Sequence, residues 1–187
     1  IKELVSNTKW MNKLTFSKKV RWEDLYMRRA VCSGSFDPVT NGHIDIFERA
    51  SRMFDEIIIS VFYNPGKDKA MFSMEERVEM LKEATKHIPN ARVTSFSGLL
   101  NEFCKQEKAP FIIRGLRAFS DFEYEFQRAL LIKHIDNNLE TVFIMTNAQY
   151  SYVSSSGVRE LACFNGPVEG LVPPFVEQKI HERMAKK

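Results

Sequence analysis

Between residues 32 and 43 the chain reads Cys32-Ser33-Gly34-Ser35-Phe36-Asp37-Pro38-Val39-Thr40-Asn41-Gly42-His43. A short apolar run precedes this stretch, and apolar residues at helical spacing follow it. We therefore expect a strand, a glycine-bearing turn and a helix that begins at Gly42-His43. The first turn of a helix has unpaired N–H groups and the positive end of the helix dipole, so this arrangement suits a phosphate. His43 could donate a hydrogen bond to an anionic oxygen. An ordinary tight turn is the alternative interpretation.

Strand and helix patterns alternate along the rest of the chain. Strands are expected at 28–32, 57–61, 91–94, 111–113 and 141–145. Helices are expected from 42 to about 54, from 73 to 86, after a cap at Ser97, from 121 to 137, from the serine run at 154–156 to 164, and from 175 to 184. The core side of the helix at 121–137 is expected to hold Phe122, Phe126, Ala129, Leu130 and Ile132. This alternation predicts an α/β fold, a doubly wound five-stranded parallel sheet with helices on both faces.

Glycines, hydroxyls and basic side chains concentrate in the segments after the expected strands. Arg114 and Arg117, on a loop with Gly115, could clamp phosphate oxygens. In a doubly wound sheet the ligand lies beyond the carboxyl ends of the strands, where the strand order reverses. Each side chain alone could be a solvated surface group. Their common position predicts a phosphate-handling active site.

Two further segments belong to the same set. The run 154–156 has three serines before a helix, where one hydroxyl can cap the helix and the others suit a triphosphate. Lys67 or Lys69, beside an Asn-Pro-Gly turn, could reach an anionic substrate. No His, Cys or Asp cluster has the spacing of a metal site, and no serine lies in a nucleophile elbow. These donors favour direct phosphoryl or nucleotidyl transfer, in which positioning and charge stabilisation supply most of the rate enhancement.

Composition limits the partners. The 187 residues have 44% hydrophobic and 27% charged side chains and a net charge of +3, which suits one globular domain. Residues 1–26 carry six basic and three acidic groups, and the remaining 161 residues carry 21 of each. The body of the protein is therefore not expected to bind nucleic acid. No apolar run approaches the length of a membrane span, no secretory signal is evident, and the three cysteines form no C-x-x-C pair, so we expect a reduced, cytoplasmic protein.

The motifs resemble a known family. Ser33–Pro38 with Thr40–His43 resembles the (H/T)-x-G-H signature of the nucleotidylyltransferase superfamily. Three later segments resemble the phosphopantetheine adenylyltransferase family, namely Ile113-Arg114-Gly115-Leu116-Arg117-Ala118, Asp121-Phe122-Glu123-Tyr124-Glu125 and Tyr150-Ser151-Tyr152-Val153-Ser154-Ser155-Ser156. The likeness runs from about Met27 to the end. The chain departs from the family pattern at Ser35, at Cys32-Ser33, at Tyr150 and in the length of the Lys67 loop.

The resemblance implies a reaction and a set of roles. Enzymes of this family make dephospho-coenzyme A and pyrophosphate from ATP and 4′-phosphopantetheine, a step of coenzyme A biosynthesis. The catalytic residues would be His43, Lys67 (or Lys69) and Arg114. ATP would contact Ser35, Phe36, His43, Gly115, Arg117, Glu125, Tyr150, Ser151, Tyr152, Val153, Ser154, Ser155 and Ser156. The acceptor would contact Ser35, Lys67, Leu100 and Arg114. Mg²⁺ would bind mainly through the ATP phosphates, coenzyme A would be a further ligand, and the assembly would be a homohexamer.

Residues 27–187 are accordingly expected to form one nucleotidylyltransferase domain. Residues 1–26, which hold both tryptophans, would be an N-terminal extension, either added or mis-started sequence or a native segment that packs on a partner. The rival functions are transfer to another phosphorylated acceptor, a non-catalytic nucleotide- or RNA-binding module that uses residues 1–26, and an inactive coenzyme A sensor. The segments 113–118 and 121–125 argue against the first rival, and His43 argues against the third.

Overall fold

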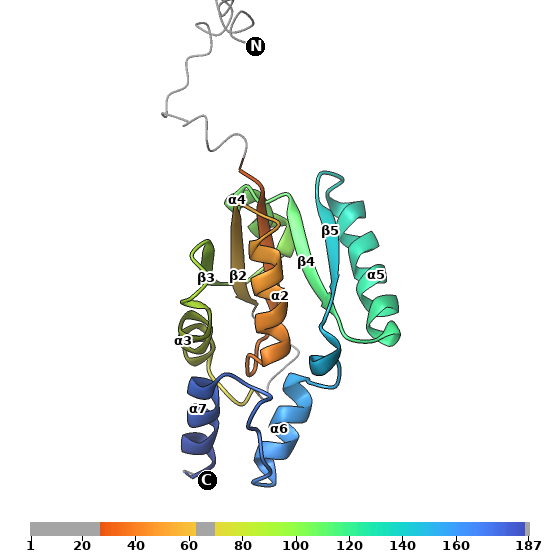
Figure 1. Cartoon of the computed structure of the whole chain (residues 1–187). Helices are drawn as coiled ribbons and strands as arrows, with labels where there is room; N and C mark the ends of the chain where they lie inside the picture. The colour runs from red at the N-terminus through yellow and green to blue at the C-terminus, as the bar shows by residue number, and fades with distance from the viewer. Residues whose placement is uncertain (1–26, 63–69, 186–187) are drawn as a thin grey trace, which may run out of the picture.

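The computed structural model of the chain describes residues 27–62 and 70–185. Its sheet is entirely parallel and has the strand order β3-β2-β1-β4-β5 (Figure 1). The strands are β1 (Arg29–Gly34), β2 (Glu56–Phe62), β3 (Ala91–Phe96), β4 (Phe111–Leu116) and β5 (Glu140–Met145). The helices are α2 (Asn41–Ser51), α3 (Met74–Thr85), α4 (Leu100–Glu107), α5 (Phe119–Ile135), the short 3-10 helix η3 (Ala148–Tyr150), α6 (Ser155–Cys163) and α7 (Pro174–Met184). The doubly wound sheet expected from the alternation is confirmed.

Helices cover both faces of the sheet. On one face, Ile57 and Ile59 of β2 belong to the same core as Phe47 of α2 and Leu81 of α3. On the other face, strand residues such as Ile58 pack with α4. Because both faces are buried, the central strands are continuous apolar runs rather than alternating ones. The strand order reverses between β1 and β4, which opens a crevice at their carboxyl ends.

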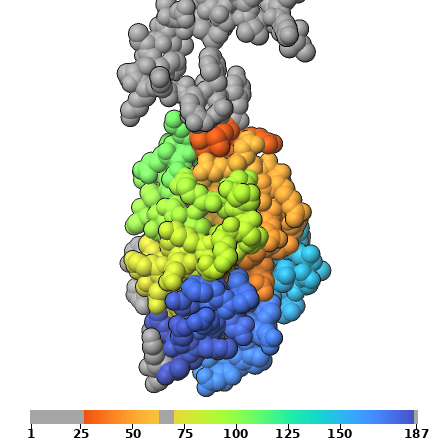
Figure 2. All heavy atoms as spheres, turned by 60° about the vertical axis from the view of Figure 1, so that its left-hand side comes forward, coloured from red at the N-terminus to blue at the C-terminus, as the bar shows by residue number. Residues whose placement is uncertain are grey.

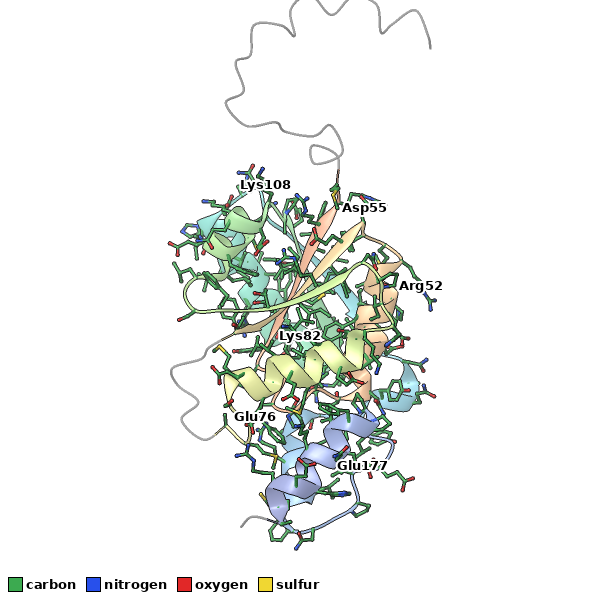
Figure 3. All side chains as sticks on the ribbon, turned by 90° about the vertical axis from the view of Figure 1, so that its left-hand side faces the viewer. Arg52, Asp55, Glu76, Lys82, Lys108 and Glu177 are labelled. Atoms are coloured by element: carbon green, nitrogen blue, oxygen red, sulfur yellow. The ribbon has the colours of Figure 1, made fainter. Side chains whose placement is uncertain are left out.

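The C-terminal part of the chain lies beyond this carboxyl edge. η3, α6 and α7 all lie at the end of the sheet where α2 begins (Figure 1). Helix α7 lies against α3, as the blue and yellow surfaces of Figure 2 and the ribbons of Figure 3 show. Ion pairs join Arg183 to Glu76 and Lys179 to Glu79, and the Arg183 guanidinium lies 5.3 Å from the centre of the Phe72 ring. These contacts fasten the C-terminal helix beside the crevice.

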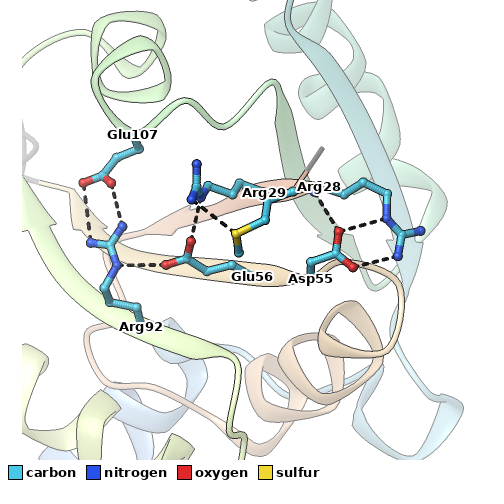
Figure 4. Close-up of polar contacts among 7 residues, drawn as sticks. Arg28, Arg29, Asp55, Glu56, Arg92 and Glu107 are labelled. Atoms are coloured by element: carbon cyan, nitrogen blue, oxygen red, sulfur yellow. Dashed lines mark hydrogen bonds and ion pairs between the residues drawn. The ribbon is translucent and has the colours of Figure 1, made fainter. Parts of the chain in front are cut away.

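Ion pairs join the strands at the opposite, amino-terminal edge (Figure 4). Arg28 donates to both carboxylate oxygens of Asp55 at 2.8–3.2 Å, and these hydrogen bonds lower the pKa of Asp55 to about 2. A second series of ion pairs connects β1, β2, β3 and the end of α4. It runs through Arg29, Glu56, Arg92 and Glu107. This edge is therefore tied by charge, far from the crevice.

Three local expectations were wrong. Arg114, Gly115 and Leu116 belong to β4 instead of a loop. A Cβ on Gly115 would lie 3.0 Å from Cγ1 of Ile46, so the glycine serves the close approach of α2 to β4 and not loop flexibility. Helix α4 begins at Leu100 with Leu99, not Ser97, as its N-cap residue.

The third error concerns α5. None of its residues is buried, and Phe126 and Leu130, which we expected in the core, are exposed. The other three residues expected there, Phe122, Ala129 and Ile132, are half-buried, with Phe122 against Phe143 of β5 and Ile132 against the core. Asp121 and Glu125 on the same side of the helix line the crevice. By contrast, the capping box at Ser73 and Glu76 that opens α3 is present as expected. Among the described residues, no helix combines the length and apolar character needed to cross a membrane.

Candidate active site

The crevice between β1 and β4 continues into a cavity of about 760 Å³. Its walls come from the end of β1 and the following turn, the start of α2, the end of β4, the cavity side of α5 and the start of α6. Its volume lies within the range typical of sites for small molecules and cofactors. This is the place at which the strand topology predicts a ligand.

Most of the candidate residues line this cavity. They are Ser35, Phe36, His43, Leu100, Arg114, Gly115, Arg117, Glu125, Val153, Ser154, Ser155 and Ser156. Three others, Tyr150, Ser151 and Tyr152, are not part of its wall, although Tyr150 lies beside Gly42, which does line the cavity. Lys67 and Lys69 lie outside the described residues. The structure thus brings together side chains that are up to 121 positions apart in the sequence.

His43 has a defined tautomer. The backbone N–H of Thr40, the N-cap residue of α2, donates to Nδ1 of His43 at 3.0 Å. Nδ1 is therefore unprotonated, and the neutral ring carries its proton on Nε2. Burial, with the positive charges of Arg117 and Arg114, lowers the pKa of His43 to about 4. Near neutral pH, His43 is an uncharged hydrogen-bond donor.

Aromatic rings fix the direction of the imidazole. The Phe36 ring meets it edge-on at 5.2 Å between centroids, and Phe47 stacks at 6.4 Å. The Phe36 side chain is buried, and its backbone is in the left-handed region with φ of +45°. A Cβ on Gly34 would lie only 2.8 Å from Cζ of Phe36, so the glycine makes room for this ring. Phe36 therefore acts by holding His43 in place.

Buried polar groups anchor the turn between β1 and α2. The Asp37 carboxylate accepts hydrogen bonds from the backbone N–H groups of Met71 and Phe72, at 2.9 and 3.0 Å. Arg77 of α3 donates to the carbonyl of Ser35 at 2.9 Å. The turn is therefore tied to the start of α3 through side chains that are themselves almost fully buried. Such bonds hold a turn in one conformation because leaving the buried groups unpaired is costly.

Helix α6 anchors the same turn from the other side. Ser155 donates to the carbonyl of Pro38 at 2.8 Å, and Arg159 donates to the carbonyl of Asp37. Ser154 is the N-cap of α6 and accepts from the N–H of Gly157 at 3.0 Å. The hydroxyl of Ser156 lies 3.1 Å from that of Ser154, so all three serines have hydrogen-bond partners. Their positions bring the N-terminus of α6 to the cavity.

Two arginines of the cavity wall, Arg114 and Arg117, are already paired with carboxylates. Arg114 donates to both oxygens of Glu125 at 2.6 Å and to the carbonyl of Ser33 at 2.6 Å. Arg117 forms a similar pair with Asp121 at 3.0 and 3.1 Å. These pairs orient the guanidinium groups and neutralise their charge. When a phosphate enters, each arginine would exchange its carboxylate partner for the phosphate.

Sequence reasoning missed Arg159, Asp121, Tyr124 and Arg128, all of which line the cavity. Arg159 lies one helical turn after the serine run. The other three share the spacing of one helix face with Glu125, a signal hidden by the aromatic residues between them. Within residues 27–62 and 70–185, no group of three or more His, Cys, Asp or Glu side chains could hold a metal ion.

Comparison with known proteins shows the family of this chain. The cytidylyltransferase-like family matches residues 31–161. A phosphopantetheine adenylyltransferase of Clostridium botulinum (strain Eklund 17B) is 57% identical over 157 residues, which are 84% of this chain and 98% of that protein. One of Symbiobacterium thermophilum is 52% identical over 160 residues, 86% of this chain and 98% of that protein. The chain belongs to the phosphopantetheine adenylyltransferase family.

A solved structure agrees at the level of the fold. A protein of Vibrio parahaemolyticus described as a nicotinate-nucleotide adenylyltransferase superposes with a TM-score of 0.60 over 82% of this chain and 97% of that one, at 16% identity. Family membership confirms the interpretation drawn from the G-H motif and the three later segments. It makes the protein a nucleotidyltransferase of coenzyme A biosynthesis.

Proposed function

We propose that this protein transfers the adenylyl group of ATP to the phosphate of 4′-phosphopantetheine, giving dephospho-coenzyme A and pyrophosphate. The observation that carries the proposal is His43, a neutral donor at the first turn of α2 in a cavity of substrate size. The names and high identity of the relatives support the choice of acceptor.

The chemistry is a direct in-line displacement. An oxygen of the acceptor phosphate forms a bond to the α-phosphorus of ATP. The bond between the α-phosphorus and the oxygen that bridges it to the β-phosphorus breaks, and its electron pair leaves with pyrophosphate. The nucleophile is already an anion, so the step needs no general base. The Nε2–H of His43 donates to a non-bridging α-oxygen as charge grows there. The positive end of the α2 dipole adds to this stabilisation.

The remaining roles follow the positions of the cavity residues. We assign ATP to the side formed by Ser35, Gly115, Arg117 and the serines of α6, with Phe36 acting through its contact with His43. We assign the acceptor to Leu100 and Arg114. Contacts of ATP with Glu125 and with Tyr150, Ser151, Tyr152 and Val153, and of Lys67 with the acceptor phosphate, remain predictions from the family pattern.

We propose that Mg²⁺ enters as the complex with ATP. The two carboxylates of the cavity wall, those of Asp121 and Glu125, are each paired with an arginine. This donor set suits an ion held mainly by phosphate oxygens and water, as Mg²⁺ often is in nucleotide sites.

We further propose a homohexamer with a cytoplasmic location, and one catalytic domain over residues 27–187 with residues 1–26 as an extension. The exposed apolar side chains of α5 support self-association, and the hexamer itself rests on the family pattern. The family match begins at residue 31, close to the start of β1 at Arg29, which supports the domain boundary. The free cysteines among the described residues fit a reducing compartment.

The test is pyrophosphate release from MgATP with and without 4′-phosphopantetheine. We expect release that depends on the acceptor and falls by at least about 10²-fold in His43→Ala, with ATP affinity nearly unchanged. An equal loss of ATP affinity would contradict the transition-state role of His43. Release with a different phosphorylated acceptor, and none with 4′-phosphopantetheine, would overturn the substrate. No release with any acceptor would favour a non-catalytic binding module.

A further inference from the structure

Helix α5 presents a polar stripe to the cavity. Asp121, Tyr124, Glu125 and Arg128 all line it, at the three- and four-residue spacings that share one helix face. Asp121 and Glu125 hold Arg117 and Arg114, respectively. Arg128 lies seven residues after Asp121, which is about 10 Å further along the helix axis.

The charge of Arg128 is not balanced by a described carboxylate. Both oxygens of the neighbouring Glu125 accept hydrogen bonds from Arg114. The contact that Arg128 does make in the described part of the chain is with the Tyr124 ring, 5.6 Å from its guanidinium carbon. A cation–π contact is not a hydrogen bond to an acceptor atom, so the N–H groups of Arg128 can still donate to another acceptor. Arg128 therefore offers an unused fork of donors to the cavity.

The position of Arg128 assigns it to the acceptor side. It shares a second hollow, of about 10 Å³, with Leu100, Arg114 and Glu125. Leu100 and Arg114 are the residues to which we assign the acceptor. The acceptor phosphate would react beside His43. If the rest of the acceptor, its arm, extends along α5, the polar groups of the arm pass Arg128.

We propose that Arg128, supported by Tyr124, is a specificity-determining residue that binds the arm of the phosphorylated acceptor and favours arms that carry a carboxylate. This inference rests on the proposed function. A guanidinium group donates single hydrogen bonds to amide carbonyls, but it forms a paired, charge-assisted contact with a carboxylate. The protein therefore accepts, besides the uncharged arm of 4′-phosphopantetheine, phosphorylated acceptors with a carboxylate in the arm.

The experiment compares two acceptors. One is 4′-phosphopantetheine, and the other is the analogue whose arm ends at the β-alanine carboxylate in place of the mercaptoethyl amide. The value of kcat/KM for pyrophosphate release is measured for the wild type, for Arg128→Gln and for the charge-matched control Arg52→Gln. Arg52 lies at the end of α2, on the surface (Figure 3). We expect the ratio of carboxylate to amide acceptor to fall by about tenfold or more in Arg128→Gln. In Arg52→Gln we expect the ratio of the two kcat/KM values to equal that of the wild type.

Two results would overturn the proposal. One is a ratio within about twofold of the wild type in Arg128→Gln. The other is an equal fall in both variants, which would reduce the effect to net charge. Calorimetric binding of the carboxylate analogue without ATP gives a readout that needs no turnover. If no acceptor supports release, the proposed function fails, while weaker binding of the analogue to Arg128→Gln would still support the subsite. Equal affinities in that assay would overturn it.

Discussion

At the scale of single residues, His43 combines three properties that its position creates. The Thr40 N–H selects the Nε2–H tautomer, the Phe36 ring fixes its direction, and burial with two arginines keeps it uncharged. A neutral donor stabilises growing negative charge without losing a proton to it. In the proposed reaction, the histidine would therefore act by hydrogen bonding and not as an acid.

We predict that the His43 ring titrates near pH 4, well below the usual midpoint of about 6.5. NMR of the imidazole signals over pH 3–8 measures this midpoint, and Arg117→Gln should raise it because one positive charge is removed. The unfolded chain binds this proton at higher pH than the folded one. His43 therefore contributes stability that is present above about pH 6.5 and is lost as the pH falls through about 4. A midpoint near 6.5 would contradict the burial argument.

At the scale of elements, the turn before α2 depends on its neighbours. Asp37 ties it to residues 71 and 72, Arg77 ties it to α3, and Ser155 and Arg159 tie it to α6. Helix α7 in turn holds α3 by ion pairs. The reactive turn is thus set by three elements that follow it in the chain.

We predict that Asp37→Asn lowers the free energy of unfolding by about 1–3 kcal/mol, because one buried N–H loses its acceptor. The same variant should lower kcat by displacing Phe36 and His43. The matched control is Asp55→Asn at the opposite edge of the sheet, whose exposed pair with Arg28 is far from the cavity. Denaturant unfolding and steady-state kinetics measure both effects. An unchanged kcat in Asp37→Asn would contradict the positioning role.

At the scale of the whole molecule, α5 packs on the sheet side through Phe122 and Ile132, but much of its apolar surface lies outside the core. Its polar stripe faces the cavity, whereas Phe119, Phe126, Leu130, Leu131 and Ile135 are exposed. An apolar surface of this kind is typical of a protein–protein contact. Helix α5 therefore lines the cavity with one face, and its exposed apolar face is the surface that we propose meets another subunit.

We predict a native mass of six times the 21.7 kDa chain by light scattering. Leu131→Glu should reduce this mass, because it places a charge in the apolar surface of α5. Met53→Glu, which changes an exposed apolar residue at the end of α2, is the control and should keep the mass of the wild type. A monomeric wild type, or a Leu131→Glu variant with unchanged mass, would contradict the proposed assembly.

Local sequence signals located most of the helices and strands and many residues of the cavity wall, but not the contacts between those residues. The apolar runs such as Ile57–Val61, the box at Ser73 and the cap at Ser154 are set by neighbouring residues, so periodicity and capping rules locate them. The environment of Arg114 could not be found in this way. Its partners Ser33 and Glu125 belong to β1 and α5, and the need for Gly115 comes from Ile46 of α2.

The sequence by itself determined the alternation of elements, the strand–turn–helix around residues 32–43 and, through its motifs, the family. The tertiary structure alone decided the protonation of His43, the pairing of Arg114 and Arg117, the anchoring of Asp37, and the exposure of Arg128 and of the apolar face of α5. The physical reason is the difference in sequence separation over which the interactions act. Hydrogen-bonding periodicity acts within a few residues, whereas desolvation, charge compensation and burial depend on groups brought together from distant parts of the chain.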